Sequence, residues 1–260
     1  MAERTSGRKH WDDFWKRDRD LDEIYDNDGR IPEEILKRMD IGGSVIMEVG
    51  AATARDSVIL AENGAVSVAL DYSHEALRLA RVAAARAGVQ LFLVCGDALA
   101  LPFRNNSIDL VFHQGVLEHF RDPMPLLREN VRVLKEDGKV LVDVPQTVHI
   151  YTLIKKILIA MNVWFAGWET QFTPQQLADL LREVDLGPET TYGRFFSPSL
   201  AYRILRELLM KLGIRMPLRP VILPPVHRFR TRLRRRIEAS FLGPRFGYIV
   251  GIIAVKKRSC

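Results

Sequence analysis

The stretch that decides the fold reads Ser44-Val45-Ile46-Met47-Glu48-Val49-Gly50-Ala51-Ala52-Thr53-Ala54-Arg55-Asp56. Its opening apolar run predicts a buried strand over 44–49. Small residues follow at 50–54, and a helical pattern then continues to Asn63. A strand that runs through a small-residue turn into a helix N-terminus lets a ligand approach the backbone closely. The stretch therefore predicts the first strand, turn and helix of a ligand-binding sheet.

Short strand patterns and longer helical patterns alternate through 44–146. We expect further strands over 66–70, 91–94, 108–112 and 139–144, and a helix over 73–87 that Ser73 can cap. Alternation of this kind is typical of βαβ units and a parallel sheet. Beyond it we expect helices over 150–165 and 173–187, a weak strand at 190–192 and a strong strand over 246–256. Two short helices, over 10–17 and 31–39, are expected before the sheet.

Chemically active side chains stand where the predicted strands end. Asp71 ends the second strand, 21 residues after Gly50. In dinucleotide-binding folds an acid at this place accepts hydrogen bonds from the ribose. The third strand is followed by Asp97, and the fourth by His113, Gln114, Glu118 and His119. Any one of these is also explained as a solvated strand end. Together with the turn at Gly50, however, they make four such places at the carboxyl edge of one sheet, which favours a binding site. A nicotinamide dehydrogenase would want a glycine at Arg55, which argues against that use of the geometry.

Taken in order, these motifs resemble those of the class I S-adenosylmethionine-dependent methyltransferases, in particular the small-molecule type. The resemblance covers 44–146, and the strand over 246–256 is similar to the terminal antiparallel strand of that family. The motifs stand at 48–56, 69–73, 96–103, 107–112, 115–119 and 132–139. The resemblance implies an α/β, Rossmann-like, doubly wound sheet of seven strands, mostly parallel with an antiparallel last strand. N-terminal helices and a basic helical insert before the last strand would complete it.

The resemblance also implies S-adenosyl-L-methionine as the cofactor, with no metal. The loop at Gly50 would pack against its methionine part, and Asp71 would bind the ribose. Asp97 and Ala98 would lie at the adenine, and Gln114 would lie near the sulfonium and the substrate. The implied cofactor-binding set is Glu48, Gly50, Ala52, Asp71, Tyr72, Asp97, Ala98 and Gln114.

One departure from the family concerns its glycine-rich loop, because alanines stand at the second and third glycine positions, Ala52 and Ala54. We expect the alanine to be harmless at Ala54, where the helix begins. At Ala52 a methyl group stands where backbone usually approaches the cofactor, and a positive φ would cost about 1 kcal/mol or more. A protein that keeps the fold and has lost catalysis is therefore an open alternative.

The candidate catalytic residues are His119 and His113, because imidazole titrates near neutral pH. Methyl transfer often proceeds without a base, so a His119 that merely packs under its loop is the competing interpretation. We expect Glu118 to orient the loop, and Glu48 to hold the turn that follows it.

The net charge of +6 is concentrated in one segment. Residues 201–245 hold twelve Lys and Arg against two acids, a net charge of +10, so the rest of the chain carries −4. The segment predicts amphipathic helices over 198–212 and 228–241. In the second helix every fourth residue is aromatic or aliphatic, and six arginines surround this stripe. A basic amphipathic helix is typical of binding to a membrane surface or a polyanion. A solvated helix that covers the substrate pocket is the alternative.

Composition and segment boundaries define the expected protein. Its 260 residues are 47 % apolar and 27 % charged, which excludes wholesale disorder. Two cysteines exclude a disulfide framework, and the polar start of the chain carries no signal-peptide core, so we expect a cytoplasmic protein with peripheral membrane contact through 228–241. We expect an N-terminal cap over 1–43, a core over 44–194 with a lid at about 150–168, a basic insert over 195–245 and a final strand over 246–260.

These observations together predict an enzyme that transfers a methyl group from S-adenosylmethionine to a small apolar or amphiphilic acceptor by in-line attack. RNA methylation through the arginine-rich insert is a weaker alternative. Phe112-His113-Gln114-Gly115 stands where enzymes that methylate base nitrogens carry an Asn/Asp-Pro-Pro-aromatic loop.

Overall fold

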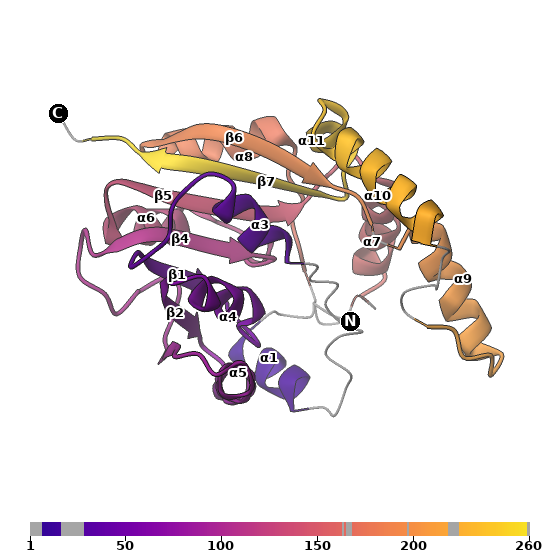
Figure 1. Cartoon of the computed structure of the whole chain (residues 1–260), viewed down its shortest axis with the longest axis horizontal. Coiled ribbons are helices and arrows are strands. Elements are labelled where there is room, and N and C mark those ends of the chain that lie inside the picture. The colour runs from indigo at the N-terminus through magenta and orange to yellow at the C-terminus, as the bar shows by residue number, and fades with distance from the viewer. Residues whose placement is uncertain are drawn as a thin grey trace.

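The computed structural model describes residues 7–16, 29–162, 164, 168–196, 198–217 and 224–258. Within them seven strands form one sheet in the order β3-β2-β1-β4-β5-β7-β6 (Figure 1). Strands β1 to β5 run parallel to one another, and β7 runs antiparallel between β5 and β6. The predicted sheet, mostly parallel with an antiparallel last strand, is therefore confirmed. The strands are β1 Val45–Val49, β2 Val66–Asp71, β3 Phe92–Cys95, β4 Ile108–Gln114, β5 Leu134–Pro145, β6 Leu186–Arg194 and β7 Ile249–Lys256.

The strand order reverses at β1. The chain moves from β1 through β2 to β3 on one side, and β4 then pairs with the other side of β1. Open α/β sheets bind ligands at such a reversal, in the crevice beyond the carboxyl ends of the strands. The topology thus brings the ends of β1, β2, β3 and β4 to one edge.

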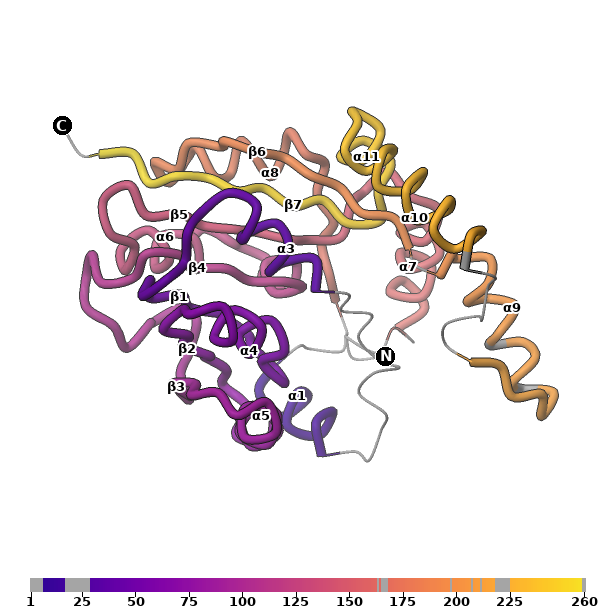
Figure 2. Tube along the Cα trace, in the orientation of Figure 1, coloured from indigo at the N-terminus to yellow at the C-terminus, as the bar shows by residue number. Residues whose placement is uncertain are grey.

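Ten α-helices and one 3₁₀ helix are assigned within the described residues. The helices are α1 Arg8–Trp15, α3 Arg30–Leu36, α4 Arg55–Glu62, α5 His74–Ala87, α6 Met124–Val133, α7 Ile150–Ala160, α8 Pro174–Glu183, α9 Leu200–Lys211, α10 Pro224–Glu238 and α11 Leu242–Phe246, with the 3₁₀ turn η1 at Leu117–His119. The predicted cap is present, because Ser73 Oγ accepts from Ala76 N. At the start of α8, Thr173 forms a reciprocal capping box with Gln176. In the trace of Figure 2, α1 runs beside α5.

The core has an apolar layer on each face of the sheet. Successive side chains of a strand point to opposite faces. Met47 and Val49 of β1 therefore pack with the cluster that includes α6 and α8. Ile46 points the other way and packs with Ile31 and Ile35 of α3. Alternation in β1 thus provides an apolar surface for helices on each face of the sheet.

Several predicted boundaries were wrong. The helix expected over 150–165 ends at Ala160, because Asn162 adopts a left-handed φ of +56° that no α-helix continues. Part of the expected lid, Val163 and residues 165–167, lies outside the described residues. Strand β5 begins at Leu134, five residues before the predicted start at 139. Its first part is irregular, because Asp137 has a left-handed φ of +61°. Strand β6 spans nine residues instead of three.

At the final strand, Phe246 belongs to α11 and β7 begins only at Ile249. The expected first helix is present as α1, but its predicted last residue, Arg17, lies outside the described residues. Among the described residues, no helix combines the length and apolar character needed to span a membrane. The division into cap, core, insert and final strand stays a prediction.

Candidate functional site

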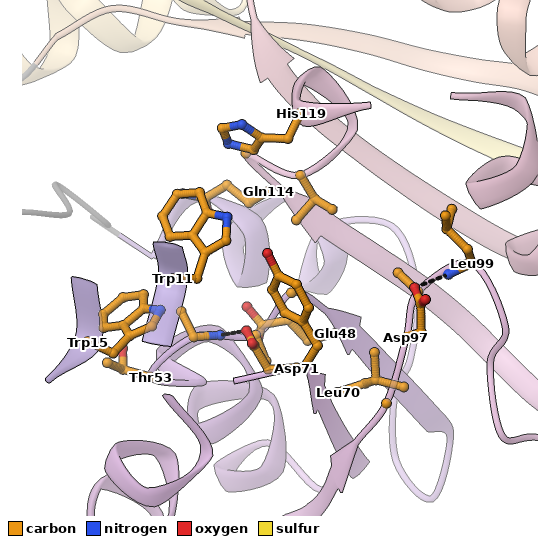
Figure 3. A pocket seen from close by; sticks show the side chains of 18 of the residues that line it. Trp11, Trp15, Glu48, Thr53, Leu70, Asp71, Asp97, Leu99, Gln114 and His119 are labelled. Atoms are coloured by element: carbon orange, nitrogen blue, oxygen red, sulfur yellow. Dashed lines mark hydrogen bonds between the residues drawn. The ribbon is translucent and has the colours of Figure 1, made fainter. Parts of the chain in front are cut away.

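A cavity of about 390 Å³ lies where β1, β2, β3 and β4 end. Trp11 and Trp15 of α1 lie on one side of it, and Asp97 and Leu99 lie on the other (Figure 3). Of the residues that the sequence singled out, the lining includes Glu48, Gly50, Ala52, Asp71, Tyr72, Asp97, Ala98, Gln114 and His119. Residues separated by more than a hundred positions in the chain therefore share one chamber.

The Asp71 carboxylate is held by two backbone amides. Its Oδ2 accepts from Ala52 N at 2.9 Å, and its Oδ1 accepts from Ser73 N at 2.8 Å. Burial raises the pKa of Asp71, while the hydrogen bonds from these amides oppose the rise. A carboxylate oxygen can accept more than one hydrogen bond, so Asp71 retains acceptor capacity toward a ligand. Through its bond from Ala52 N, the same carboxylate connects the end of β2 to the turn after β1.

Glu48 ties the end of β1 to the first turn of α4. Its Oε2 accepts from Ser57 N at 3.2 Å and from Ser57 Oγ at 2.6 Å. Burial raises the pKa of Glu48 well above its ordinary value, and the neighbouring charge of Asp56 raises it further. The side chain therefore stabilises the turn between β1 and α4 by bonding to the first turn of the helix.

The turn itself is built on three left-handed residues. Gly50 has φ +67°, Ala52 +50° and Ala54 +53°. A Cβ at Gly50 would lie 2.5 Å from Val116 Cγ2, so a side chain at this position would displace Val116. An L-residue in this region is strained by about 1–2 kcal/mol. Ala54, the N-cap residue of α4, has the same left-handed backbone as Ala52, which its position at the helix start did not predict; that alanine is harmless there stays a prediction.

Helix α1 covers the cavity from the N-terminal side. Phe14 and Trp15 pack in a small cluster on Ala76 of α5, and the methyl of Ala52 contacts the same cluster. Ser73 Oγ also donates to Asp12 Oδ1 of α1 at 2.6 Å. The sequence predicts a helix over 10–17, but Trp11 and Trp15 were not among the predicted site residues. Two tryptophans four residues apart in a charged segment occupy one helix face, and that spacing was the signal available.

The β3 end of the cavity carries Asp97. Its Oδ1 accepts from Leu99 N at 2.9 Å, which fixes the carboxylate at the rim, and the side chain is exposed. Gly96 N donates to the Asp71 carbonyl at 3.1 Å, so this loop is bonded directly to the end of β2. The two acids thus stand at adjacent strand ends with fixed orientations.

The β4 end of the cavity carries Gln114 and His119. Gln114 Oε1 is buried, and no hydrogen-bond partner for it occurs among the described residues. The ring of His119 lies edge-on to Trp11, with ring centroids 5.3 Å apart. Burial lowers the pKa of His119, although the neighbouring Glu169 charge and a hydrogen bond to the Trp168 backbone oppose this. His119 is therefore a largely neutral imidazole at pH 7.

A buried acid–base cluster lies behind His119. Lys155 Nζ pairs with Glu169 Oε2 at 2.6 Å, and Trp164 Nε1 donates to Glu169 Oε1 at 2.6 Å. Thr170 N donates to the Glu118 carbonyl at 2.8 Å. Burial, with the Glu169 charge, raises the pKa of Glu118 to about 8. The cluster ties α7 and residues 169–170 to the loop that carries His119.

His113 does not line the cavity. It shares the face of β4 with Val111, toward the core, and is fully buried. Burial lowers its pKa to about 4. Of the two histidines proposed as catalytic, the fold brings only His119 together with the predicted cofactor residues.

Comparison with known proteins agrees with this fold. Residues 47–142 match the model of a methyltransferase domain. A demethylmenaquinone methyltransferase of Renibacterium salmoninarum is 34 % identical over 102 residues, which are 39 % of this chain and 41 % of that protein. A ubiquinone biosynthesis O-methyltransferase of Ruegeria pomeroyi is 25 % identical over 175 residues, covering 65 % of this chain and 71 % of that protein. The chain thus spans less than half the length of the first relative.

A solved structure extends the likeness to the whole fold. The magnesium protoporphyrin IX methyltransferase of Synechocystis PCC 6803, with bound SAH, superposes with a TM-score of 0.59 at 13 % identity and covers 96 % of this chain and 93 % of that chain. The sheet order, the site at its reversal and the matched domain define a class I methyltransferase fold. Residues 47–142 are a methyltransferase domain, and the fold built around them is that of the class I S-adenosylmethionine-dependent methyltransferases.

Proposed function

We propose that the protein transfers a methyl group from S-adenosylmethionine to a small amphiphilic acceptor. The observation that carries this proposal is the continuity of one cavity. Its acidic part, at Asp71 and Asp97, joins the part that holds Gln114 and His119. A two-substrate reaction needs both reactants aligned in one chamber, and this arrangement supports that.

The residues present fit the cofactor. The acceptor capacity of the Asp71 carboxylate suits two ribose hydroxyls, and the rim acid Asp97 suits an exocyclic amine. The close turn at Gly50 suits the methionine part. Gln114 Oε1 is a buried acceptor that still needs a polar partner, which a ligand in this cavity would supply. When bound, S-adenosylmethionine would supply an electrophilic methyl group on a sulfonium.

The chain's own residues would position the acceptor and exclude water. Trp11, Trp15 and Phe120 give the cavity wide apolar walls. His119, kept neutral by burial, would accept a proton from an acceptor hydroxyl or activated ring carbon. Its hydrogen bond to the Trp168 backbone would hold the ring in one orientation, as a general base requires.

For the acceptor we propose a quinone-type aromatic ring. The two relatives described above are named for demethylmenaquinone and ubiquinone biosynthesis. The aromatic and aliphatic lining of this cavity supports the same class, because flat apolar rings stack favourably against tryptophan and phenylalanine. His119 would lie beside the ring position that receives the methyl group.

Calorimetric titration with S-adenosylmethionine tests the cofactor part of the proposal. Wild-type protein should bind, and Asp71→Ala should abolish binding while circular dichroism stays unchanged. Asp179→Asn is the matched control, since this acid lies exposed on α8, away from the cavity. Absence of binding to the wild-type protein would overturn the proposal. Mass spectrometry of quinone precursors incubated with enzyme and cofactor then tests the acceptor class.

A further inference from the structure

The three helices α7, α9 and α10 lie together at the end of the sheet where β5 terminates (Figure 1). We propose that the exposed side of these helices, here called the helical face, docks on a bilayer surface of anionic phospholipids. The inference concerns where the protein works and does not rest on the proposed methyl transfer.

Helix α7 is packed with its apolar side outward. Its buried residues are polar: Thr152 Oγ1 donates to the Gln146 carbonyl at 2.6 Å, and Lys155 pairs with Glu169. The apolar stripe of α7 is in contact with solvent, with Ile150 66 % and Leu153 59 % exposed. Soluble proteins rarely leave such a stripe uncovered, so α7 indicates an interaction surface.

Helices α9 and α10 extend the same character. Ile204, Leu208 and Leu212 are exposed on and just after α9. On α10, Phe229 is 67 % exposed and Leu233 48 %. Phe196 joins the elements, because its ring contacts Tyr151 of α7 at 5.1 Å between centroids and lies under the Arg203 guanidinium of α9 at 5.2 Å. The three helices therefore present apolar side chains from one end of the molecule.

The charge around these side chains selects the partner. At 100° per residue, Arg230, Arg232 and Arg236 flank the stripe that Phe229 and Leu233 form on α10. All three arginines are exposed. Arginines beside an apolar stripe suit a lipid surface, since apolar groups enter the acyl boundary while guanidinium groups reach the phosphates. A second copy would set two strongly basic faces against each other, and RNA would leave the apolar stripe without a partner.

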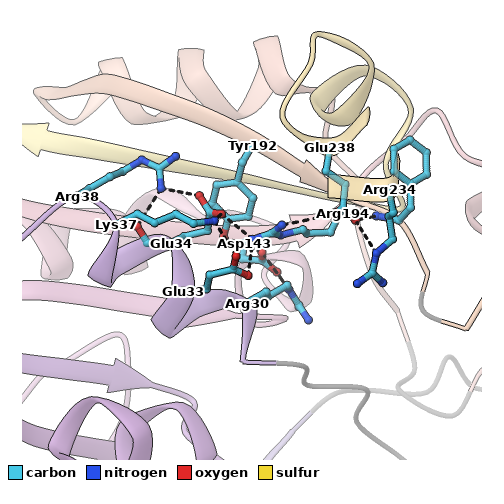
Figure 4. A network of polar contacts seen from close by, with 11 residues as sticks. Arg30, Glu33, Glu34, Lys37, Arg38, Asp143, Tyr192, Arg194, Arg234 and Glu238 are labelled. Atoms are coloured by element: carbon cyan, nitrogen blue, oxygen red, sulfur yellow. Dashed lines mark hydrogen bonds and ion pairs between the residues drawn. The ribbon is translucent and has the colours of Figure 1, made fainter. Parts of the chain in front are cut away.

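The acids near α10 do not cancel this charge. The single acid within residues 224–241 is Glu238, which is buried. Arg194 of β6 lies between Glu238 at 3.2 Å and Glu34 of α3 at 2.6 Å (Figure 4). This ion-pair network fastens the end of α10 to the sheet and to α3. The exposed length of the helix therefore projects arginine and apolar side chains from a fixed base.

Co-sedimentation with vesicles tests the proposal. The full chain is mixed with vesicles of phosphatidylcholine alone and with vesicles that contain one third phosphatidylglycerol. We expect binding to the anionic vesicles that weakens with salt. The triple change Arg230→Gln, Arg232→Gln and Arg236→Gln should lower partitioning about 100-fold, because each charge near an anionic surface contributes about fivefold. The double change Phe229→Ser and Leu233→Ser should lower it more than tenfold.

A matched control is the triple change Arg78→Gln, Arg81→Gln and Arg86→Gln on α5. These arginines are also exposed on a helix but lie away from the helical face, and their loss should leave partitioning within threefold of wild type. Equal loss in both triple variants would overturn a specific docking face. Unchanged binding in the α10 variants would overturn it as well. Sedimentation velocity that shows self-association through this face, or salt-dependent RNA binding without vesicle binding, would assign the face to another partner.

Discussion

Replacing Ala52 by glycine should make the protein more stable, and replacing Ala54 should not. Both alanines have left-handed backbone, with φ +50° and +53°. Relief of this strain contributes about 1–2 kcal/mol per residue, and the greater freedom of glycine in the unfolded chain takes back about 0.5–1 kcal/mol. The backbone alone therefore favours glycine by about 0.5–1 kcal/mol at either position.

The methyl groups separate the two positions. Ala54 is fully buried, and its methyl packs with Ala51, Ala69 and Ala80. Removing a buried methyl costs about 0.8 kcal/mol, which cancels the backbone gain. Ala52 is only partly buried against α1, so removing its methyl group costs less free energy of unfolding. We expect Ala52→Gly to gain about 0.5 kcal/mol and Ala54→Gly to lie near zero.

Urea denaturation with a shared slope measures this difference. A gain of 0.5 kcal/mol corresponds to about 1–2 °C in melting temperature for a chain of this size. Only Ala52 lines the cavity, so a change in S-adenosylmethionine affinity should accompany Ala52→Gly and not Ala54→Gly. If Ala52→Gly is destabilised, or if Ala54→Gly is the more stable variant, the assignment of strain to this turn is wrong.

Three further predictions concern the same site. Gly50→Ala should destabilise the protein by about 2 kcal/mol or more, because its Cβ would collide with Val116 at a positive φ, and thermal melts measure this. Glu118 loses its proton near pH 4.5 when unfolded but near pH 8 when folded, so wild-type stability should fall, relative to Glu118→Gln, as pH rises through that window. Urea titrations at pH 5 and 8 would show the divergence, and parallel curves would contradict the shifted pKa. His119→Gln should lower turnover by about 100-fold or more with unchanged cofactor affinity, whereas a parallel loss of affinity would make it a binding residue.

Much of the sheet could be predicted because its signals are local. Apolar runs define β1, β2 and β4, and a capping residue such as Ser73 fixes a helix start through contacts within one turn. The residues at the strand ends were predictable for the same reason, since parallel strands place their carboxyl ends at one edge. Asp71 and Asp97 are therefore found in the cavity where their positions in the sequence indicated.

Other features could not be predicted because they depend on contacts between distant segments. The sequence places an apolar stripe on α7, but only the pairing of Lys155 with Glu169 and the bond from Thr152 to Gln146 turn that stripe toward solvent. Strand direction likewise sends His113 into the core, while the turn after β4 brings His119 into the cavity.

The sequence by itself determined the positions of strands β1, β2 and β4 and the acidic residues at the strand ends of the candidate cofactor site, because short-range pattern and spacing specify them. The tertiary structure alone decided that Trp11 and Trp15 close the cavity, that two alanines bear left-handed strain, and that the basic segment shares its end of the molecule with α7. Each of these follows from packing between segments far apart in the chain, whose free energy no local pattern encodes.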